Sequence, residues 1–214
     1  PIINTPGMFG DEVADIAFCY LICLARNIVQ IHNGIIKNKW LKLRGNSLKD
    51  SVIGIVGYGD IGKNLTKRVL TSGMKAQIYD PFIEDLNSPE ELITRENWPD
   101  KLNNCDYVVL TCSLNSSNYH FLNEEVFKIM KHGVKIINVS RGPLIDETQL
   151  IKELISGKVN SVALDVFENE PLTADSPLRN FDNCIFGSHN ASNTKEAVLK
   201  TSLKAMKILY DFFK

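Results

Sequence analysis

The chain has 214 residues, of which 44% are hydrophobic and 23% are charged, and its formal net charge is -1. A chain of this size can bury a substantial core, as ordinary globular proteins do. The near-neutral charge, with lysines spread among acids, excludes the basic footprint of a nucleic-acid-binding protein or of one that binds an anionic membrane.

The cysteines and apolar stretches indicate the compartment. Five cysteines form an odd set without a Cys-x-x-Cys pair, so the sequence predicts neither a disulfide framework nor a metal site. The most apolar stretch, Ile16 to Ile28, is interrupted by Arg26 and is too short to span a bilayer. We therefore expect a cytoplasmic protein without a membrane partner.

The first predicted element is a long helix over residues 12–38. Apolar residues recur there at helical spacing: Val13, Ile16, Ala17, Leu21, Leu24, Ile28, Ile31 and Ile35. Its broad apolar surface would fit a partner chain.

A strand, a glycine-rich turn and a helix follow. Ser51 to Val56 is an apolar run rich in β-branched residues, and the pattern becomes helical after Gly62. Gly57 allows a tight turn, Gly59 leaves room for a pyrophosphate, and Gly62 lets the helix pack close to the strand. The phosphates would meet the amides and positive dipole end of that helix. This pattern predicts a dinucleotide site.

A second apolar run, Ala76 to Tyr79, ends in Asp80, about twenty residues further on. A carboxylate at this place accepts hydrogen bonds from the ribose hydroxyls of the cofactor. Asp80 would repel the 2'-phosphate of NADP, and no nearby arginine follows it. The sequence therefore favours NAD.

The rest of the chain alternates between predicted strands and helices. Strands are expected at 107–111, 134–139, 162–166 and 184–187, and helices near 90–94, at 123–130, at 147–155 and from 192 onward. Such alternation implies an α/β fold with a doubly wound parallel sheet of the Rossmann type. Six polar or small residues fall at predicted strand ends, where such sheets bind ligands: Gly57, Asp80, Cys112, Arg141, Asp165 and His189.

Several segments together resemble the D-isomer-specific 2-hydroxyacid dehydrogenases, the family of phosphoglycerate, D-lactate and glycerate dehydrogenases. The segments are Asn4 to Gly7 with Val13-Ala14, the Gly57 turn, Ile137 to Gly142 through Asp146, Ala163 to Phe167, Glu170-Pro171 and His189.

The resemblance implies a role for each matching residue. Arg141 would bind the carboxylate and keto oxygen of the substrate, His189 would be the general acid and base, and Glu170 would orient it. It also implies cofactor contacts from Asp60, Ile61, Cys112, Val139, Ser140, Asp165 and the His189 loop.

Elementary chemistry supports these roles. Reducing a 2-keto acid puts negative charge on the carbonyl oxygen, so the site needs a proton donor and a fixed cation. A histidine beside a carboxylate is a suitable donor, and the planar fork of Arg141 can hold a carboxylate bidentately. Glu168 competes with Glu170 for the place beside His189. Only the resemblance, which puts the acid just before Pro171, separates them. His32, His120 and His132 are interpreted as surface or structural residues.

The resemblance also sets the expected domain organisation. Residues 10–190 would form the NAD-binding domain, while 1–9 and 191–214 would be connections to a flavodoxin-like substrate domain mostly missing from this chain. Such a piece would be inactive alone, because its cleft has one wall. Members of the family pair through the cofactor domain, so we expect a homodimer to which the helix at 12–38 contributes.

Two alternatives remain open. One is a relative that oxidises another small anion, such as formate or phosphite; Glu170 argues against formate, because those relatives carry glutamine there. The other is a non-catalytic, NAD-sensing interaction module of the same fold. The identity of the 2-hydroxy acid is not encoded in the motifs.

Overall fold

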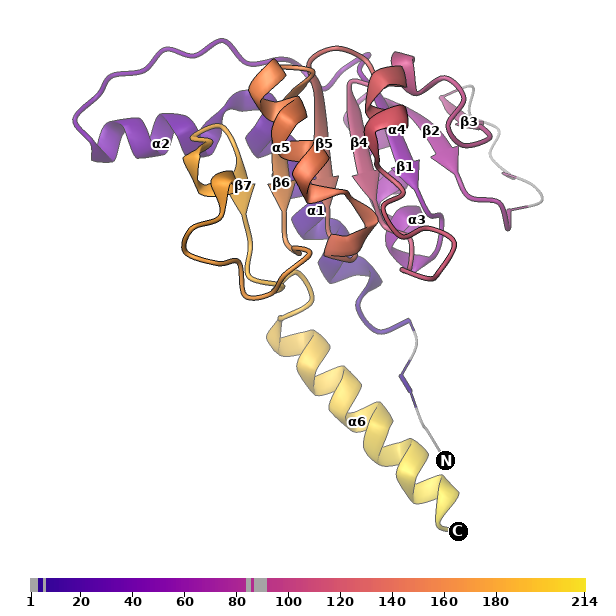
Figure 1. The fold of residues 1–214 in the computed structure, drawn as a ribbon. Helices are drawn as coiled ribbons and strands as arrows, with labels where there is room; N and C mark the ends of the chain where they lie inside the picture. The colour runs from indigo at the N-terminus through magenta and orange to yellow at the C-terminus, as the bar shows by residue number, and fades with distance from the viewer. Residues whose placement is uncertain (1–3, 6, 84–85, 87–91) are drawn as a thin grey trace.

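The computed structural model describes residues 4–5, 7–83, 86 and 92–214, and its centre is a seven-stranded sheet. The strand order is β3-β2-β1-β4-β5-β6-β7, and every neighbouring pair is parallel (Figure 1). The strands are β1 (Val52–Val56), β2 (Lys75–Tyr79), β3 (Ile93–Arg95), β4 (Tyr107–Leu110), β5 (Val134–Asn138), β6 (Val159–Leu164) and β7 (Ile185–Phe186). The predicted parallel sheet is confirmed.

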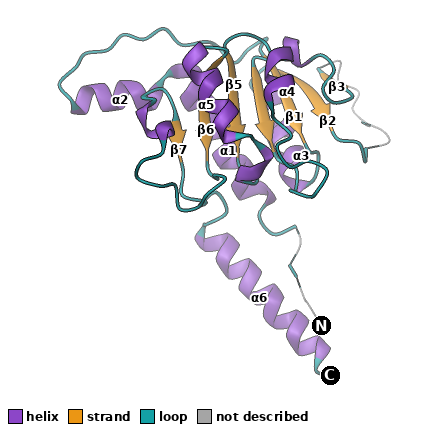
Figure 2. Ribbon diagram, viewed as in Figure 1, coloured by secondary structure: helices purple, strands orange, loops and turns teal. Residues whose placement is uncertain are grey.

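Helices cover both faces of this sheet (Figure 2). The described helices are α1 (Gly10–Arg26), α2 (Ile28–Ile36), α3 (Asp60–Thr71), α4 (Glu124–Ile129), α5 (Glu147–Ser156) and α6 (Lys195–Phe212), with short 3-10 turns η1 (Leu102–Asn104), η2 (Gly142–Leu144) and η3 (Pro177–Asn180). Helices α1 and α3 lie on one face, α4 and α5 lie on the other, and α6 extends away from the sheet (Figure 1). Within the described residues no single helix could cross a bilayer, and one pair, α1 with α2, reaches the length and apolar composition only together, across a 67° bend.

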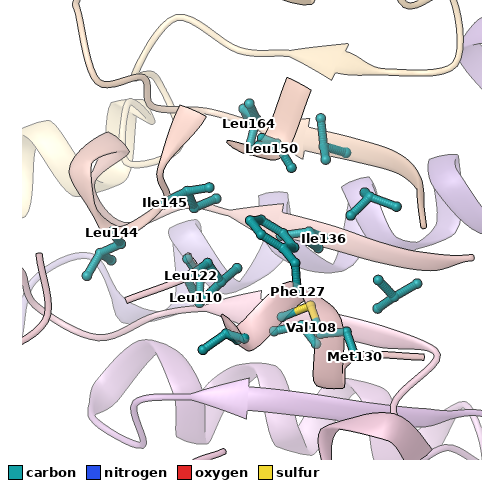
Figure 3. Close-up of a cluster of buried hydrophobic side chains, with 14 of the residues drawn as sticks. Val108, Leu110, Leu122, Phe127, Met130, Ile136, Leu144, Ile145, Leu150 and Leu164 are labelled. Carbon is teal, nitrogen blue, oxygen red and sulfur yellow. The ribbon is translucent and has the colours of Figure 1, made fainter. Parts of the chain in front are cut away.

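The core has two halves, one on each face. On one face α4 and α5 pack on the sheet, with Phe127 and Met130 against Val108 and Ile136 (Figure 3). On the other face α1 and α3 bury Leu21 and similar residues against alternate strand positions. Because successive strand residues point to opposite faces, buried runs such as that of β4 serve both halves.

The predicted helix over residues 12–38 is two helices in the structure. Asn27, between α1 and α2, has a φ of 55° in the left-handed region, and its backbone N–H bonds to the Cys23 carbonyl and ends α1. Its side-chain amide donates to the Arg44 carbonyl at 3.0 Å. Asparagine adopts this conformation more readily than most residues, so the break has a local cause.

The predicted short helix near residues 90–94 is wrong where the structure describes it. Ile93–Arg95 is strand β3, parallel to β2. Ile93 and Thr94 are β-branched and favour a strand, and the open edge of β2 supplies the pairing. Residues 90 and 91 lie outside the described residues.

The site is positioned by the change of winding direction at β1. This strand pairs with β2 on one side and with β4 on the other, so the chain runs outward in both directions from it. In doubly wound sheets the crevice at the carboxyl ends beside such a point is where ligands bind.

Candidate active site

The glycine-rich turn links the end of β1 to the start of α3. Gly57 has a φ of +95°, and a Cβ there would stand 2.6 Å from the backbone N and Cα of Cys112. A Cβ on Gly62 would stand 2.2 Å from the Gly57 carbonyl oxygen. Only glycine fits at these two places, as the pattern predicted.

The third glycine, Gly59, faces open space instead. Nothing lies within 4 Å of where its Cβ would stand. Gly59 also precedes α3, whose first turn has no side-chain cap. The uncapped amides and the helix dipole favour an anion here, and the missing side chain leaves the approach clear.

A cleft of about 610 Å³ opens beside this turn, a volume typical of ligand sites. Its lining comes from the ends of β1, β2 and β3, the turns that follow them and the loop after β4. It includes Gly57, Gly59, Asp80, Pro81, Phe82, Arg95, Trp98, Cys112, Ser113 and Asn118. The glycine cradle, Asp80 and the open helix end fit a dinucleotide.

Asp80 lies in this cleft with its carboxylate held by backbone amides. Tyr58 N–H donates to Oδ2 at 2.7 Å and Phe82 N–H donates to Oδ1 at 2.9 Å. The carboxylate is thus fixed beside the turn, with lone pairs left to accept. Arg95, at the end of β3, lines the same cleft. The expectation that no arginine lies near Asp80 is therefore wrong, because β3 pairs with β2 and brings Arg95 to this edge from fifteen positions further along the chain.

Other residues proposed to contact the cofactor lie at different depths. Cys112 lines the cleft, and burial raises the pKa of its thiol to about 11, so it stays protonated at neutral pH. The Ser140 hydroxyl donates to the Cys112 carbonyl, and Val139 is buried in the core.

Two predicted residues present no side chain to the cleft. The Asp60 side chain lies against Gly10, where a Cβ would stand 2.0 Å from its Oδ2, and Asn64 donates to its Oδ1. Ile61 packs against the core half formed by α1 and α3. Only their backbone can face a ligand at the helix start.

Two of the three predicted catalytic residues, Glu170 and His189, are in direct contact at the edge of the sheet formed by the strand ends. His189 Nδ1 lies 2.7 Å from Glu170 Oε2. Arg141 follows β5, and its guanidinium donates to the Ser140 carbonyl at 2.6 Å. Its positive charge is one of the causes that lower the pKa of Glu170. Since Glu170 engages Nδ1, Nε2 is the ring nitrogen left to exchange a proton with a substrate.

The environment of Glu170 keeps it ionised. Burial alone would raise its pKa, but the hydrogen bonds from His189 and from Phe167 N–H, together with the charges of His189 and Arg141, lower the pKa below its ordinary value. Phe167 N–H donates to Glu170 Oε1 at 3.0 Å. A cavity of about 590 Å³ opens beside the pair and is lined by Phe167, Leu172, Phe186, Glu170 and His189.

Glu168, the competing acid, faces elsewhere. Its Oε1 contacts His120 Nε2, and no hydrogen bond joins it to His189 among the described residues. Geometry thus agrees with the resemblance that Glu170 is the partner of His189.

Asp165 anchors the loop that carries His189. Its carboxylate is buried and accepts from the N–H groups of Asn190 at 3.2 Å and Ala191 at 2.9 Å, while its carbonyl accepts from His189 N–H at 2.7 Å. The Tyr20 hydroxyl donates to Oδ1 at 3.5 Å. Burial, with the neighbouring Asp165 charge, raises the pKa of Tyr20 and keeps it a donor. Nothing in the sequence pattern marks Tyr20, which lies 145 positions from its partner.

Comparison with known proteins identifies the family. Residues 18–191 match the model of the D-isomer specific 2-hydroxyacid dehydrogenase, NAD binding domain. Hydroxypyruvate reductase of Thermotoga maritima is 33% identical over 98% of this chain and 69% of its own length. Glyoxylate reductase of Thermofilum pendens is 36% identical over 92% of this chain and 60% of its length.

A solved structure gives the same result. The glyoxylate reductase of Paecilomyes thermophila superposes with a TM-score of 0.84 at 30% identity, covering 93% of this chain and 61% of that one. The chain therefore spans about 60% to 69% of the length of these relatives. It belongs to the D-isomer specific 2-hydroxyacid dehydrogenase family and contains the NAD-binding domain of that family.

Proposed function

We propose that the protein transfers a hydride between NAD(H) and a small D-2-hydroxy acid or 2-keto acid. The observation that carries the proposal is the Glu170–His189 pair at 2.7 Å, on the edge of the sheet that also bears the glycine cradle. Membership of the family supports an oxidoreductase, and the site supplies the groups that such a reaction needs.

The reduction needs charge and proton control at one carbonyl. Bound NADH supplies the hydride, which reaches the keto carbon. His189 Nε2 gives a proton to the oxygen as negative charge develops there, so the product is the hydroxy acid. Glu170 holds the ring by Nδ1 and leaves Nε2 for the substrate. Arg141 binds the substrate carboxylate through its fork and orients the carbonyl.

The residues proposed to bind the cofactor have three roles: making room for the pyrophosphate, binding the ribose and positioning the His189 loop. Gly57, Gly59 and Gly62 leave room for the pyrophosphate at the start of α3, and Asp80 accepts from the ribose hydroxyls. Asp80 favours NAD over NADP, since a 2'-phosphate would meet its charge. Asp165 would hold the His189 loop against the nicotinamide.

The second wall of the cleft would come from a substrate domain. Residues 10–190 would form the NAD-binding domain, with 1–9 and 191–214 as connections. Helix α6 projects away from the sheet (Figure 1) and exposes apolar residues, including Leu199, Leu203, Met206 and Tyr210. This exposed face supports a second domain packed against α6, and without that domain the site would have no activity.

A homodimer would form through α2 and the arm that follows it, residues 37–47. Ile36 is 70% exposed and Trp40 is 80% exposed, with Ile28, Ile35 and Leu43 also uncovered. The arm is held on α2, since Lys39 N–H bonds to the Gly34 carbonyl at 2.8 Å. An ordered apolar surface of this kind supports a second copy as its partner.

The test is turnover in the full-length protein. NADH absorbance would be followed against 3-phosphohydroxypyruvate, hydroxypyruvate, glyoxylate and pyruvate. We expect at least one to be reduced, with His189→Ala lowering kcat by about two to four decades and Arg141→Ala by about two to three.

His132→Ala is the matched control, because His132 is exposed and far from the cleft lining. It should leave kcat unchanged. Unaltered turnover in the His189 variant would refute the mechanism. Absence of any keto acid reduction, together with a protein partner that binds only in the presence of NADH, would select the non-catalytic sensing module instead.

A further inference from the structure

The loop after β6 carries two carboxylates, and each pairs with a different histidine. Glu170 contacts His189 in the site described above. Glu168 contacts Nε2 of His120, a residue of the loop between β4 and α4. Both members of this second pair are partly shielded, with side chains 30% and 22% exposed. The proposed reaction does not use them.

His120 meets more than one acid. Asp146 Oδ2 lies 4.0 Å from its Nδ1, and Glu147 Oε2 accepts from Glu168 N–H at 3.4 Å. Burial, with the nearby charge of Glu168, raises the pKa of Glu147. Among the described residues, His120 is the one basic side chain with an ion pair to any of these three acids. Two carboxylates, those of Glu168 and Asp146, therefore face His120, and the carboxylate of Glu147 accepts from the Glu168 backbone.

The backbone around His120 is joined to the segment that follows Arg141. His120 N–H donates to the Pro143 carbonyl at 2.8 Å. Leu122 and Ile145 then form a parallel bridge, so the two segments run side by side. A displacement of His120 would therefore also displace the backbone that follows Arg141.

The segment after Arg141 also touches the carboxylate loop. A Cβ on Gly142 would stand 1.9 Å from the carbonyl carbon and oxygen of Phe167 and 2.4 Å from Glu168 N. Two backbones approach here as closely as glycine permits. Phe167 in turn donates its N–H to Glu170 Oε1. The segments bearing Arg141, Glu170 and His120 are therefore stacked on one another.

We propose that the His120–Glu168 pair is a positioning pair, which fixes the loop of Glu170 against the segment of Arg141. This rests on the proposed dehydrogenase function. Glu168 lies in the same loop as Glu170, two residues before it, and His120 is hydrogen-bonded to Pro143, two residues after Arg141. The contact between Glu168 and His120 therefore connects the Glu170 loop to the Arg141 segment. Loss of the contact would let Glu170 drift from His189, and displacements of about 1 Å can cost a catalytic site up to 100-fold.

The test compares Glu168→Gln in the wild-type and Glu170→Gln backgrounds of the full-length protein. In the wild type we expect kcat to fall by about tenfold, with KM for NADH changed less than twofold, because the cradle is not touched. In the Glu170→Gln background the same change should cost less than about twofold, since the pair acts through Glu170. Equal losses in both backgrounds would overturn the proposal.

The charge arrangement gives a second arm. His120→Gln leaves Glu168 and Asp146 without their basic partner, so it should cost more than Glu168→Gln. The double variant His120→Gln/Glu168→Gln removes one of those acids and should recover part of kcat. A double variant worse than both single ones would overturn the pairing. Glu125→Gln, which removes an exposed charge on α4, is the matched control and should be silent.

Hydrogen exchange separates this proposal from the proposed function. Amides of the segment 167–170 should exchange several-fold faster in Glu168→Gln than in Glu125→Gln. If the wild type reduces no keto acid while exchange still rises, the dehydrogenase proposal fails and the structural tie stands without a catalytic role. If the wild type is active, and both exchange and kcat are unaltered in Glu168→Gln, the positioning pair is refuted.

Discussion

Gly187 stands where the His189 loop leaves β7. A Cβ at this position would lie 2.1 Å from Asp165 Oδ1, 3.1 Å from Asp165 Cα and 2.6 Å from the Tyr20 hydroxyl. The two closest atoms belong to side chains that are hydrogen-bonded to each other, so a Cβ would displace the Asp165 carboxylate and the Tyr20 hydroxyl. The absence of a side chain at Gly187 is thus a condition for the hydrogen bonds that hold the loop.

We predict that Gly187→Ala lowers kcat/KM at least tenfold and destabilises the fold by about 1–3 kcal/mol, because the Asp165 carboxylate must move. Turnover of the preferred keto acid and thermal unfolding measure the two effects. Ser188→Ala, one position further on at an exposed residue, serves as the control. Wild-type turnover in Gly187→Ala would show that these contacts do not position His189.

The lowered pKa of Glu170 makes a prediction about acid stability. A carboxyl whose pKa is lower in the folded than in the unfolded state stabilises the fold above its unfolded value, near 4.5, and loses this contribution as pH falls through its folded value. The melting temperature of the wild type should therefore exceed that of Glu170→Gln at pH 6. The difference should shrink toward pH 3. A difference that stays constant between these pH values would contradict the assignment.

The partners of the two acids in the loop after β6 could not be predicted from the sequence. Glu168 and Glu170 differ by two positions, and no local periodicity separates them. Their partners lie 48 and 19 positions away and approach only when β4, β6 and β7 join one sheet. The same holds for Tyr20, which reaches Asp165 across 145 positions. Side-chain pairs of this kind are not visible in a local sequence pattern. The glycines of the turn are, because each is required by close contacts within the strand, turn and helix that carry it.

At the scale of elements, the strands could be predicted because they are buried on both faces and read as continuous apolar runs. Their ends then placed Asp80, Arg141 and His189 on one edge. Two predicted elements were wrong because their form depends on tertiary pairing or on the backbone of a single residue, not on a run of buried residues. Strand β3 is three residues long and exists through pairing with β2. The break at Asn27 changes the direction of the chain without disturbing the apolar spacing on either side.

At the scale of the whole molecule, two uncovered apolar surfaces lie on different elements. One is the arm with α2 and the other is α6 (Figure 1). The first is proposed to meet a second copy and the second to meet a substrate domain, so their effects on assembly should be separable by substitution.

We predict that Ile36→Asp/Trp40→Asp converts the proposed dimer to monomers. Burying either side chain contributes about 1.5–3 kcal/mol, so losing both should weaken association by at least 100-fold, and the carboxylates would add a desolvation cost. Light scattering after size exclusion gives the mass. Leu203→Asp on α6 carries the same change at a comparably exposed residue and should leave the dimer intact. A dimer that survives in the arm variant but dissociates in the α6 variant would reverse the assignment of the two surfaces.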